Sequence, residues 1–218
     1  MIKGGFQVTT YTTNDFQAIL KGRRSIRQFD ESVKISKEEM TNILQDTITA
    51  PSSVNMQPWR FVVAESSAAK EKLTPLVRFN QNQNNTSSAM ILIFGDLKNF
   101  DYSEQIYGTA VEQGLMPAEV KEQQLSVLTP LYKQIPADKM KETVLIDGSL
   151  AAMQLMLIAR TYGYETSPIG GFERDQLAAA FDLDPQRYVP VMIVAIGKGL
   201  DAGYPSYRLP VADITTWV

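Results

Sequence analysis

The sequence of this 218-residue chain predicts an α+β fold, in which helices enclose a small sheet. Two apolar runs without polar alternation, at residues 90–94 and 189–196, are typical of strands that are buried on both faces. Apolar residues at helical spacing fill most of the remaining chain, and strand patterns are few. The chain has no internal repeat and no linker of domain size, so residues 1–218 are expected to form one domain.

Two helices are predicted before the first strand. The first is expected to have Thr13 or Asn14 as its N-cap and to run to residue 22. The second follows a capping box at residues 36–39 and carries apolar residues at helical spacing. Because proline interrupts a helix, this second helix is expected to end before Pro51.

The next segments alternate between strand and helix. The β-branched and aromatic residues 61–63 predict a strand, and Ser66 or Ser67 opens a short helix through residue 73. A polar tract at residues 80–85 then precedes the buried strand at residues 90–94.

The second half is predicted to be mostly helical. Residues 100–135 have a helical pattern that is broken near Gly114 and Pro117. The longest helix is expected over residues 138–162, with Gly163 as the left-handed residue that ends it. This helix is apolar nearly all round, which favours a subunit interface. The remaining elements are a loop at residues 168–171, a helix at 173–181, the strand at 189–196 and a tail at 199–218.

The composition excludes several kinds of chemistry. The chain contains no cysteine and no histidine, so it has no Ser-His-Asp triad, no imidazole base, no thiolate nucleophile and no histidine-bound metal. Its acidic residues are scattered, so no metal site is predicted. The formal net charge of −3 does not favour binding to nucleic acid or to a membrane surface. An enzyme of this composition must therefore use the remaining polar side chains or a borrowed cofactor.

Targeting signals are not evident in the sequence. The first 15 residues have no apolar stretch of the length of a signal peptide. In the most apolar segment, only 12 uncharged residues separate Asp147 from Arg160, which is short of the ~20 that span a bilayer. We expect a soluble, cytoplasmic protein.

Four segments are candidates for binding a ligand. The first has three guanidinium groups and a hydroxyl within five residues, which suits phosphate oxygens, although a solvated basic turn after a helix has the same pattern. It consists of Arg23, Arg24, Ser25 and Arg27. The second places small polar side chains near prolines and suits a flat ligand rich in heteroatoms, or it is simply a helix stop before a strand. Its candidates are Pro51, Ser52, Ser53 and Asn55.

The other two segments are shorter. Paired glycines let the main chain approach a ligand closely, although an ordinary turn also uses them. This segment comprises Pro168, Ile169, Gly170 and Gly171. Arg208 is an isolated cation in the tail. No phosphate-loop lysine motif and no G-x-G-x-x-G fingerprint is present.

In their order and spacing, these segments resemble the bacterial nitroreductase family of flavin mononucleotide (FMN) enzymes. The resemblance extends over residues 15–212 and is carried by RRSIRQF at 23–29, APSSVNMQPWRFVV at 50–63, and SPIGGF at 167–172 before the VPVMIVAIGKG strand. It implies a small central mixed sheet flanked by helices. It also implies an intertwined homodimer with a long interface helix, a C-terminal extension onto the partner, and two FMN sites built from both chains.

The resemblance assigns roles residue by residue. The residues implied to hold the FMN phosphate and ribityl end are Arg23, Ser25, Arg27 and Arg208, and Arg24 is a further cofactor-binding candidate. Those implied to edge the isoalloxazine ring from the partner chain are Pro51, Ser52, Ser53 and Asn55. The residues implied to line the other side of the ring are Pro168, Ile169, Gly170 and Gly171, with the N–H of one of the two glycines near flavin N5. Asn80 is implied to be a further contact of the ring. Two positions depart from the family, because Gln83 stands where many members have a lysine and Ser206 where many have a second cation.

The implied activity is reduction of nitroaromatics, quinones or similar acceptors, with NADH or NADPH as donor, by two-electron ping-pong transfer. Because the flavin carries the electrons, no side-chain acid or base is required. Other flavin chemistry on the same scaffold (dehalogenation, desaturation, azoline oxidation) and a non-turnover FMN-binding protein for sensing or storage remain alternatives. Residues 100–135 form the expected variable lid. Its candidate stacking groups, for which core packing is an equal alternative, are Phe100, Tyr102, Tyr107 and Tyr132.

Overall fold

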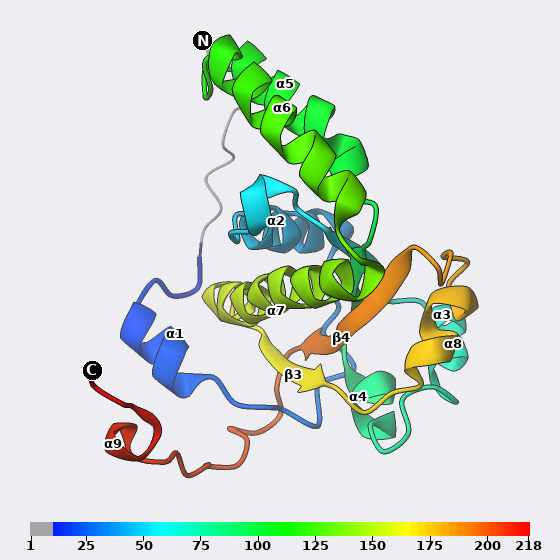
Figure 1. Ribbon diagram of the computed structural model, residues 1–218. Coiled ribbons are helices and arrows are strands. Elements are labelled where there is room, and N and C mark those ends of the chain that lie inside the picture. Colours follow the sequence, from blue (N-terminus) through cyan, green and yellow to red (C-terminus); the bar gives the residue numbers. More distant parts are fainter. Residues whose placement is uncertain (1–10) are drawn as a thin grey trace.

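The computed structural model describes residues 11–218, which form a four-stranded sheet surrounded by helices (Figure 1). The strand order is β1-β2-β4-β3. Their bounds are Trp59–Ala64 for β1, Ala89–Asp96 for β2, Glu165–Ile169 for β3 and Tyr188–Gly197 for β4. The predicted α+β class is confirmed.

The sheet corrects two expectations. Every pair of neighbouring strands is antiparallel, so the sheet of these four strands is not mixed. Pro168 and Ile169 lie in β3, although the sequence favoured a loop there. Proline has no N–H to donate to a sheet, but β3 lies at the sheet edge, where one side of the strand needs no partner. The strand was not predicted, because the proline and glycines of Pro-Ile-Gly-Gly are typical of a turn.

Helices account for most of the remaining described chain. Their bounds are Phe16–Gly22 (α1), Lys37–Thr47 (α2), Ser67–Leu73 (α3), Gln81–Thr86 (α4), Ser103–Glu112 (α5), Ala118–Gln134 (α6), Ala137–Thr161 (α7), Arg174–Ala180 (α8) and Val211–Ile214 (α9). Short 3-10 turns lie at Ser53–Asn55 (η1) and Asn99–Tyr102 (η2).

The predicted helix signals are mostly confirmed. The Ser36 hydroxyl accepts from the Glu39 N–H as an N-cap, and Gly163 adopts the predicted left-handed conformation (φ 82°). The predicted N-cap of α1, Thr13 or Asn14, is wrong by at least one residue. Asp15 caps this helix instead, because its carboxylate accepts from two amides of the first turn.

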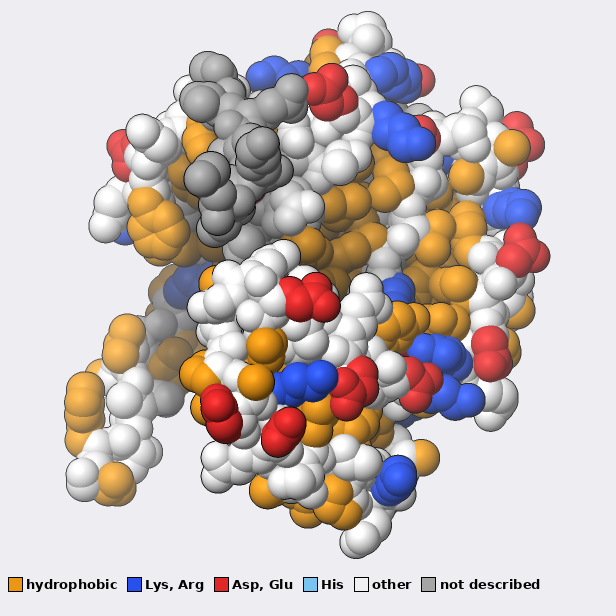
Figure 2. All heavy atoms as spheres, turned by 90° about the horizontal axis from the view of Figure 1, so that it is seen from above, with side chains coloured by type: hydrophobic (Ala, Val, Ile, Leu, Met, Phe, Trp, Pro, Cys, Tyr) orange, Lys and Arg blue, Asp and Glu red, His pale blue; other side chains and the backbone are white. Residues whose placement is uncertain are grey.

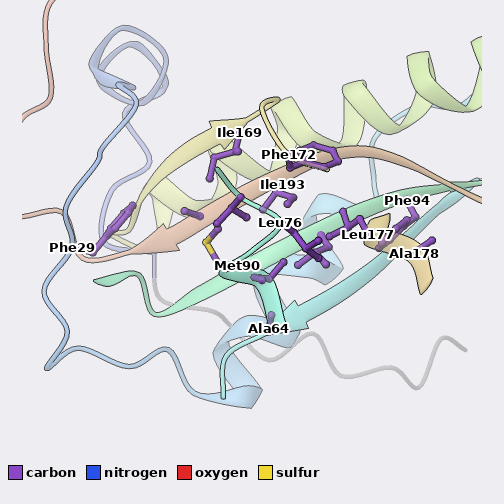
Figure 3. Packing of buried hydrophobic residues seen from close by; sticks show 14 of the residues in the cluster. Phe29, Ala64, Leu76, Met90, Phe94, Ile169, Phe172, Leu177, Ala178 and Ile193 are labelled. Atoms are coloured by element: carbon purple, nitrogen blue, oxygen red, sulfur yellow. The ribbon is translucent and has the colours of Figure 1, made fainter. Parts of the chain in front are cut away.

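The core lies on both faces of the sheet. All eight residues of β2 are buried, as its uninterrupted apolar run predicted. One face packs against α3 and α8 and includes Phe94 and Leu177 (Figure 3). The other face packs against α2 and α7 and includes Ile43 and Leu155. The sheet, which is packed on both faces, therefore holds the segments attached to it in fixed positions.

The long helix α7 crosses the sheet at close range (Figure 1). A Cβ on Gly95 would lie 2.6 Å from Val144, and one on Gly148 would lie 2.7 Å from Val191. Glycine at these positions lets helix and sheet approach. By length and composition α7 could cross a membrane, contrary to the expectation from its charges. Its packing on the sheet is that of a core helix.

Two parts extend from this body. Helices α5 and α6 form a pair that projects at one end, and the tail with α9 extends from another side (Figure 1). Hydrophobic side chains remain exposed on the surface, as Figure 2 shows for one face. On α1, α7 and the tail, the exposed large hydrophobic residues include Phe16, Leu20, Ile146, Leu150, Met153, Leu209, Val211, Ile214 and Trp217.

Candidate functional site

The structure brings the arginine segment and the tail together around one cavity of about 350 Å³. Its lining residues are Arg23, Arg24, Ser25, Arg27, Tyr204, Pro205, Ser206 and Arg208. Four guanidinium groups and no carboxylate line this cavity, which we call the arginine pocket. Its charge suits an anion, since guanidinium forks match phosphate and carboxylate oxygens.

The extended backbone after α1 explains how this segment faces the pocket. The Ile26 N–H donates to the Thr166 carbonyl of β3 over 3.0 Å, and Ser25 forms a parallel bridge with the same residue. Because side chains alternate along extended chain, Ile26 is buried while Ser25 and Arg27 are exposed. Ser25 and Arg27 therefore lie on the same side of this extended segment.

Arg24 has a partly structural role. Its guanidinium donates to the carbonyls of Lys21 and Arg23, over 2.7 and 2.9 Å, at the end of α1. Such contacts satisfy the unpaired carbonyls of a helix C-terminus. The alternative reading, a cation at the end of a helix, thus applies to Arg24, which still lines the pocket.

The tail closes the pocket at a glycine. Gly203 has φ 70°, and a Cβ there would lie 2.7 Å from that of Arg24. The next residue, Tyr204, lies under the guanidinium of Arg27, 5.4 Å from the ring centroid. Further on, Arg208 donates to the Ser206 hydroxyl over 2.7 Å. The sequence did not predict roles for Gly203 and Tyr204, because a single Gly-Tyr pair in a tail carries no recognisable signal.

One orphaned donor tests whether an anion fits the pocket. The Nη1 atom of Arg23 is buried and has no hydrogen-bond partner among the described residues. A buried charged donor without a partner is costly, so such atoms usually face a ligand or water that satisfies them. The pocket residues therefore fit an anionic group such as the FMN phosphate.

The glycine pair forms a neighbouring wall. Gly170 and Gly171 are exposed after β3, and a Cβ on Gly170 would meet no atom within 4 Å. The Asn80 amide donates to the Gly171 carbonyl over 3.3 Å. The next turn of α4 reaches the arginine segment, because Asn82 donates to the Arg27 carbonyl over 2.6 Å. Asn80, the glycine pair and the arginine pocket are thus contiguous.

Gln83, which departs from the family pattern, is buried and donates to the Asn80 side-chain oxygen over 3.3 Å. It supports the amide of Asn80 from within α4.

The segment with Pro51, Ser52, Ser53 and Asn55 lies elsewhere in the chain. Ser53 contacts Asp147 in the middle of α7, whereas Gly22, next to the arginine segment, lies against Arg160 near the end of that helix. Arg160 comes 13 positions after Asp147, which is a rise of roughly 20 Å along the helix. One chain therefore does not bring residues 51–57, which we call the ring-edge turn, to the arginine pocket.

Asp147 is a buried carboxylate that holds the ring-edge turn. It accepts from the N–H of Ser53 over 3.0 Å and from the Ser53 hydroxyl over 3.3 Å. Burial raises the pKa of Asp147, and the two hydrogen bonds oppose that rise. Its place as a lone charge within the apolar part of α7 was the signal that could have marked it.

The lid residues divide between the two alternatives. Phe100 and Tyr132 stack on each other with centroids 4.3 Å apart, and Tyr107 is buried against Met56, so these three pack in a core. Tyr102 instead lines a cavity of about 490 Å³ between α5 and the ring-edge turn. Its other linings include Asn55, Gln57, Arg60, Gln105, Ile106 and Thr109.

Within residues 11–218, no group of three acidic residues is placed to hold a metal ion.

Known proteins match this fold and these motifs over nearly the whole chain. The model of the Nitroreductase family matches residues 20–198. YdgI of Bacillus subtilis, named as an NAD(P)H nitroreductase, is 58% identical over 94% of this chain and 98% of its own. The enone reductase of CLA biosynthesis from Lactiplantibacillus plantarum is 36% identical over 88% of each chain. The chain belongs to the nitroreductase family.

Solved structures agree. A nitroreductase structure from Exiguobacterium sibiricum, in complex with FMN, has a TM-score of 0.93 and 57% identity, covering 96% of this chain and all of that one. A structure from Staphylococcus epidermidis, named as an NAD(P)H:FMN oxidoreductase, also has a TM-score of 0.93, with 48% identity over 94% of this chain and 97% of that one. The nitroreductase fold of this chain is confirmed.

Proposed function

We propose that this chain is an FMN-dependent NAD(P)H oxidoreductase of the nitroreductase type, acting as a cytoplasmic homodimer on nitroaromatics, quinones or similar acceptors. The observation that carries the proposal is the arginine pocket, in which four guanidinium groups surround a cavity and the buried Nη1 of Arg23 has no partner. An FMN phosphate supplies the anion that this pocket lacks within the chain. The FMN-bound relative supports the choice of ligand.

Each part of the site has one task in this proposal. Arg23, Ser25, Arg27 and Arg208 hold the phosphate and ribityl end by charge-assisted hydrogen bonds. Beyond them, Pro168, Ile169, Gly170 and Gly171 offer an exposed main chain to one side of the ring, with Asn80 beside them. When bound, FMN supplies a two-electron carrier between the nicotinamide and the acceptor, which occupy the site in turn. The absence of histidine and cysteine is then no obstacle.

A homodimer completes the site. The ring-edge turn and the arginine pocket lie at opposite parts of α7, so both can reach one ring only when they come from two copies. Exposed apolar residues on α7 and in the tail provide surface for such a contact. The tail would extend onto the partner, and α7 would lie at the interface.

The test is the visible spectrum of the purified protein. We expect a yellow protein whose flavin band is bleached by NADH or NADPH without oxygen and returns when a nitroaromatic or a quinone is added. A colourless protein that takes up no added FMN would contradict the proposal. A protein that binds FMN but turns over with no donor and acceptor pair would instead be a sensing or storage protein.

A second acceptor class is favoured by one comparison. The relative from Lactiplantibacillus plantarum is named as an enone reductase, and it is 36% identical to this chain. An α,β-unsaturated ketone therefore belongs in the same acceptor panel. If only the enone restores the flavin band, the activity is reduction of a carbon–carbon double bond rather than of a nitro group.

A further inference from the structure

The ring-edge turn has an unusual backbone. Three of its residues have positive φ although none is glycine, with Val54 at 43°, Asn55 at 58° and Gln57 at 46°. Asparagine tolerates this left-handed region, but a β-branched residue such as Val54 is a genuine outlier there. Strained backbone of this kind persists where the surrounding structure holds it, and it gathers at ligand sites.

Three side chains from other elements hold this turn. Asp147 of α7 accepts from the Ser53 N–H, as described above. Arg60 of β1 donates to the Gln57 carbonyl over 2.9 Å. Tyr107 of α5 donates from its hydroxyl to the Val54 carbonyl over 2.8 Å. The last contact falls on the most strained residue of the turn.

Tyr107 is itself fixed in place. It is 4% exposed and packs in a cluster with Met56 of the turn and Leu128 of α6. Burial raises the pKa of Tyr107, so its hydroxyl remains a proton donor at neutral pH. A buried tyrosine hydroxyl requires a partner, and the Val54 carbonyl provides it in this fold.

We infer that Tyr107 is a positioning residue of the flavin site: by holding the Val54 carbonyl, it keeps the left-handed backbone of Val54 and Asn55 and so aims the polar groups of the turn at the ring edge. This inference rests on the proposed function for the identity of the ring. It also couples the lid to the ring edge, because α5 carries both Tyr107 and residues that line the 490 Å³ cavity beside Asn55. An acceptor bound in that cavity would touch the element that sets the turn.

The first test uses the protein without cofactor. Tyr107→Phe keeps the ring and its packing and removes only the hydroxyl. The amides of Asn55 and Met56 donate to the Ser52 and Ser53 carbonyls, so their hydrogen exchange reports on the turn. We expect exchange roughly two- to tenfold faster in the variant, the effect of losing one hydrogen bond, with the amides of α6 unchanged.

The matched control is Tyr132→Phe. Tyr132 lies in the same cluster, and its hydroxyl makes no hydrogen bond to any described residue. This variant should leave exchange in the turn at the parent rate. If both variants speed exchange equally, or neither does, the assignment of Tyr107 is overturned.

The second test uses the FMN-loaded protein. Tyr107→Phe should still bind FMN, because the arginine pocket is untouched, but the flavin visible band and midpoint potential should shift and kcat/KM should fall two- to tenfold. In a Val54→Asn background the same change should have a smaller effect, because asparagine adopts positive φ readily. A variant flavin with the parent's spectrum, potential and kcat/KM overturns this inference alone, whereas a parent that takes up no FMN overturns the proposed function as well.

Discussion

The main-chain N–H of Ser53 donates to the carboxylate of Asp147, 94 residues away in the sequence, over 3.0 Å. This bond joins the ring-edge turn to the middle of the helix that crosses the sheet. Asp147 is 3% exposed, so its charge is held by hydrogen bonds rather than by water. The pair thus links the stability of α7 to the position of a predicted flavin contact.

Asp147 makes the stability of the protein depend on pH. Its pKa is raised by burial, so the unfolded chain releases this proton at lower pH than the folded chain does. From about pH 4 upward the folded state therefore holds more protons, and the stability that protonated Asp147 contributes at low pH is lost as the pH rises through the raised pKa.

We expect the free energy of unfolding of the parent, relative to Asp147→Asn, to fall between pH 4 and pH 7. Urea denaturation at both values measures it. Asp138→Asn, at an exposed position of the same helix, is the control and should show a smaller change with pH. A difference between parent and Asp147→Asn that rises with pH would contradict the raised pKa.

The arginine pocket predicts the determinants of FMN affinity. Arg27→Ala or Arg208→Ala should weaken FMN binding by about 1.5–3 kcal/mol, the range for a hydrogen bond to a charged group. This is a roughly ten- to hundredfold rise in Kd, measured by flavin fluorescence titration. Because FMN stabilises only the folded state, excess FMN should raise the Tm of the variants by mass action.

The control for this prediction is Lys98→Ala. Lys98 is exposed and follows β2 at the end of the sheet opposite to the arginine pocket. An arginine control such as Arg174→Ala would be unsuitable for this comparison. Arg174 donates to the Pro190 carbonyl and lies over Phe172, next to the glycine pair. Equal FMN affinity in parent, Arg27→Ala and Arg208→Ala would place the phosphate elsewhere.

Gly203 predicts that the tail must fold back for FMN to bind. Gly203→Ala adds strain at φ 70° and places a Cβ 2.7 Å from Arg24, so it should displace the tail and raise the FMN Kd at least tenfold. Gly114→Ala is a matched control, because Gly114 has φ 71° but no atom within 4 Å of an added Cβ. It should lower Tm slightly and leave Kd unchanged. Parallel loss of affinity in both variants would show that backbone strain alone is responsible.

Asp96 predicts a loss of stability at the end of the sheet opposite to the arginine pocket. Its carboxylate is fully buried at the end of β2, where it accepts two hydrogen bonds from Arg187, over 2.8 and 2.9 Å, and one from Arg60. Asp96→Ala leaves two partly buried guanidinium groups without their partner, so the free energy of unfolding should fall by about 3 kcal/mol. Asp101→Ala removes an exposed carboxylate 3.6 Å from Arg187 and should cost less than about 1 kcal/mol. Similar losses from both would mean that burial of Asp96 does not matter.

Local sequence signals determined most of the secondary structure. The Ser36 cap, the glycine at position 163 and the uninterrupted apolar run of β2 each act through neighbours in the chain, so composition and spacing reveal them. The same signals failed at β3, because its pairing with β4 outweighs the turn preference of Pro168 and the glycines after it. The motifs alone also identify the arginine, glycine and ring-edge segments as candidates for binding a ligand.

Only the tertiary structure decided how these segments combine. It brought Arg208 to Arg27 through the turn at Gly203, and it separated both from Ser53 by much of the length of α7. It also revealed Asp147 and Tyr107, whose roles depend on partners far away in the sequence. Hydrogen bonding to a distant carbonyl or amide leaves no periodic or compositional trace, because any buried polar residue can make such a bond once the fold supplies the partner.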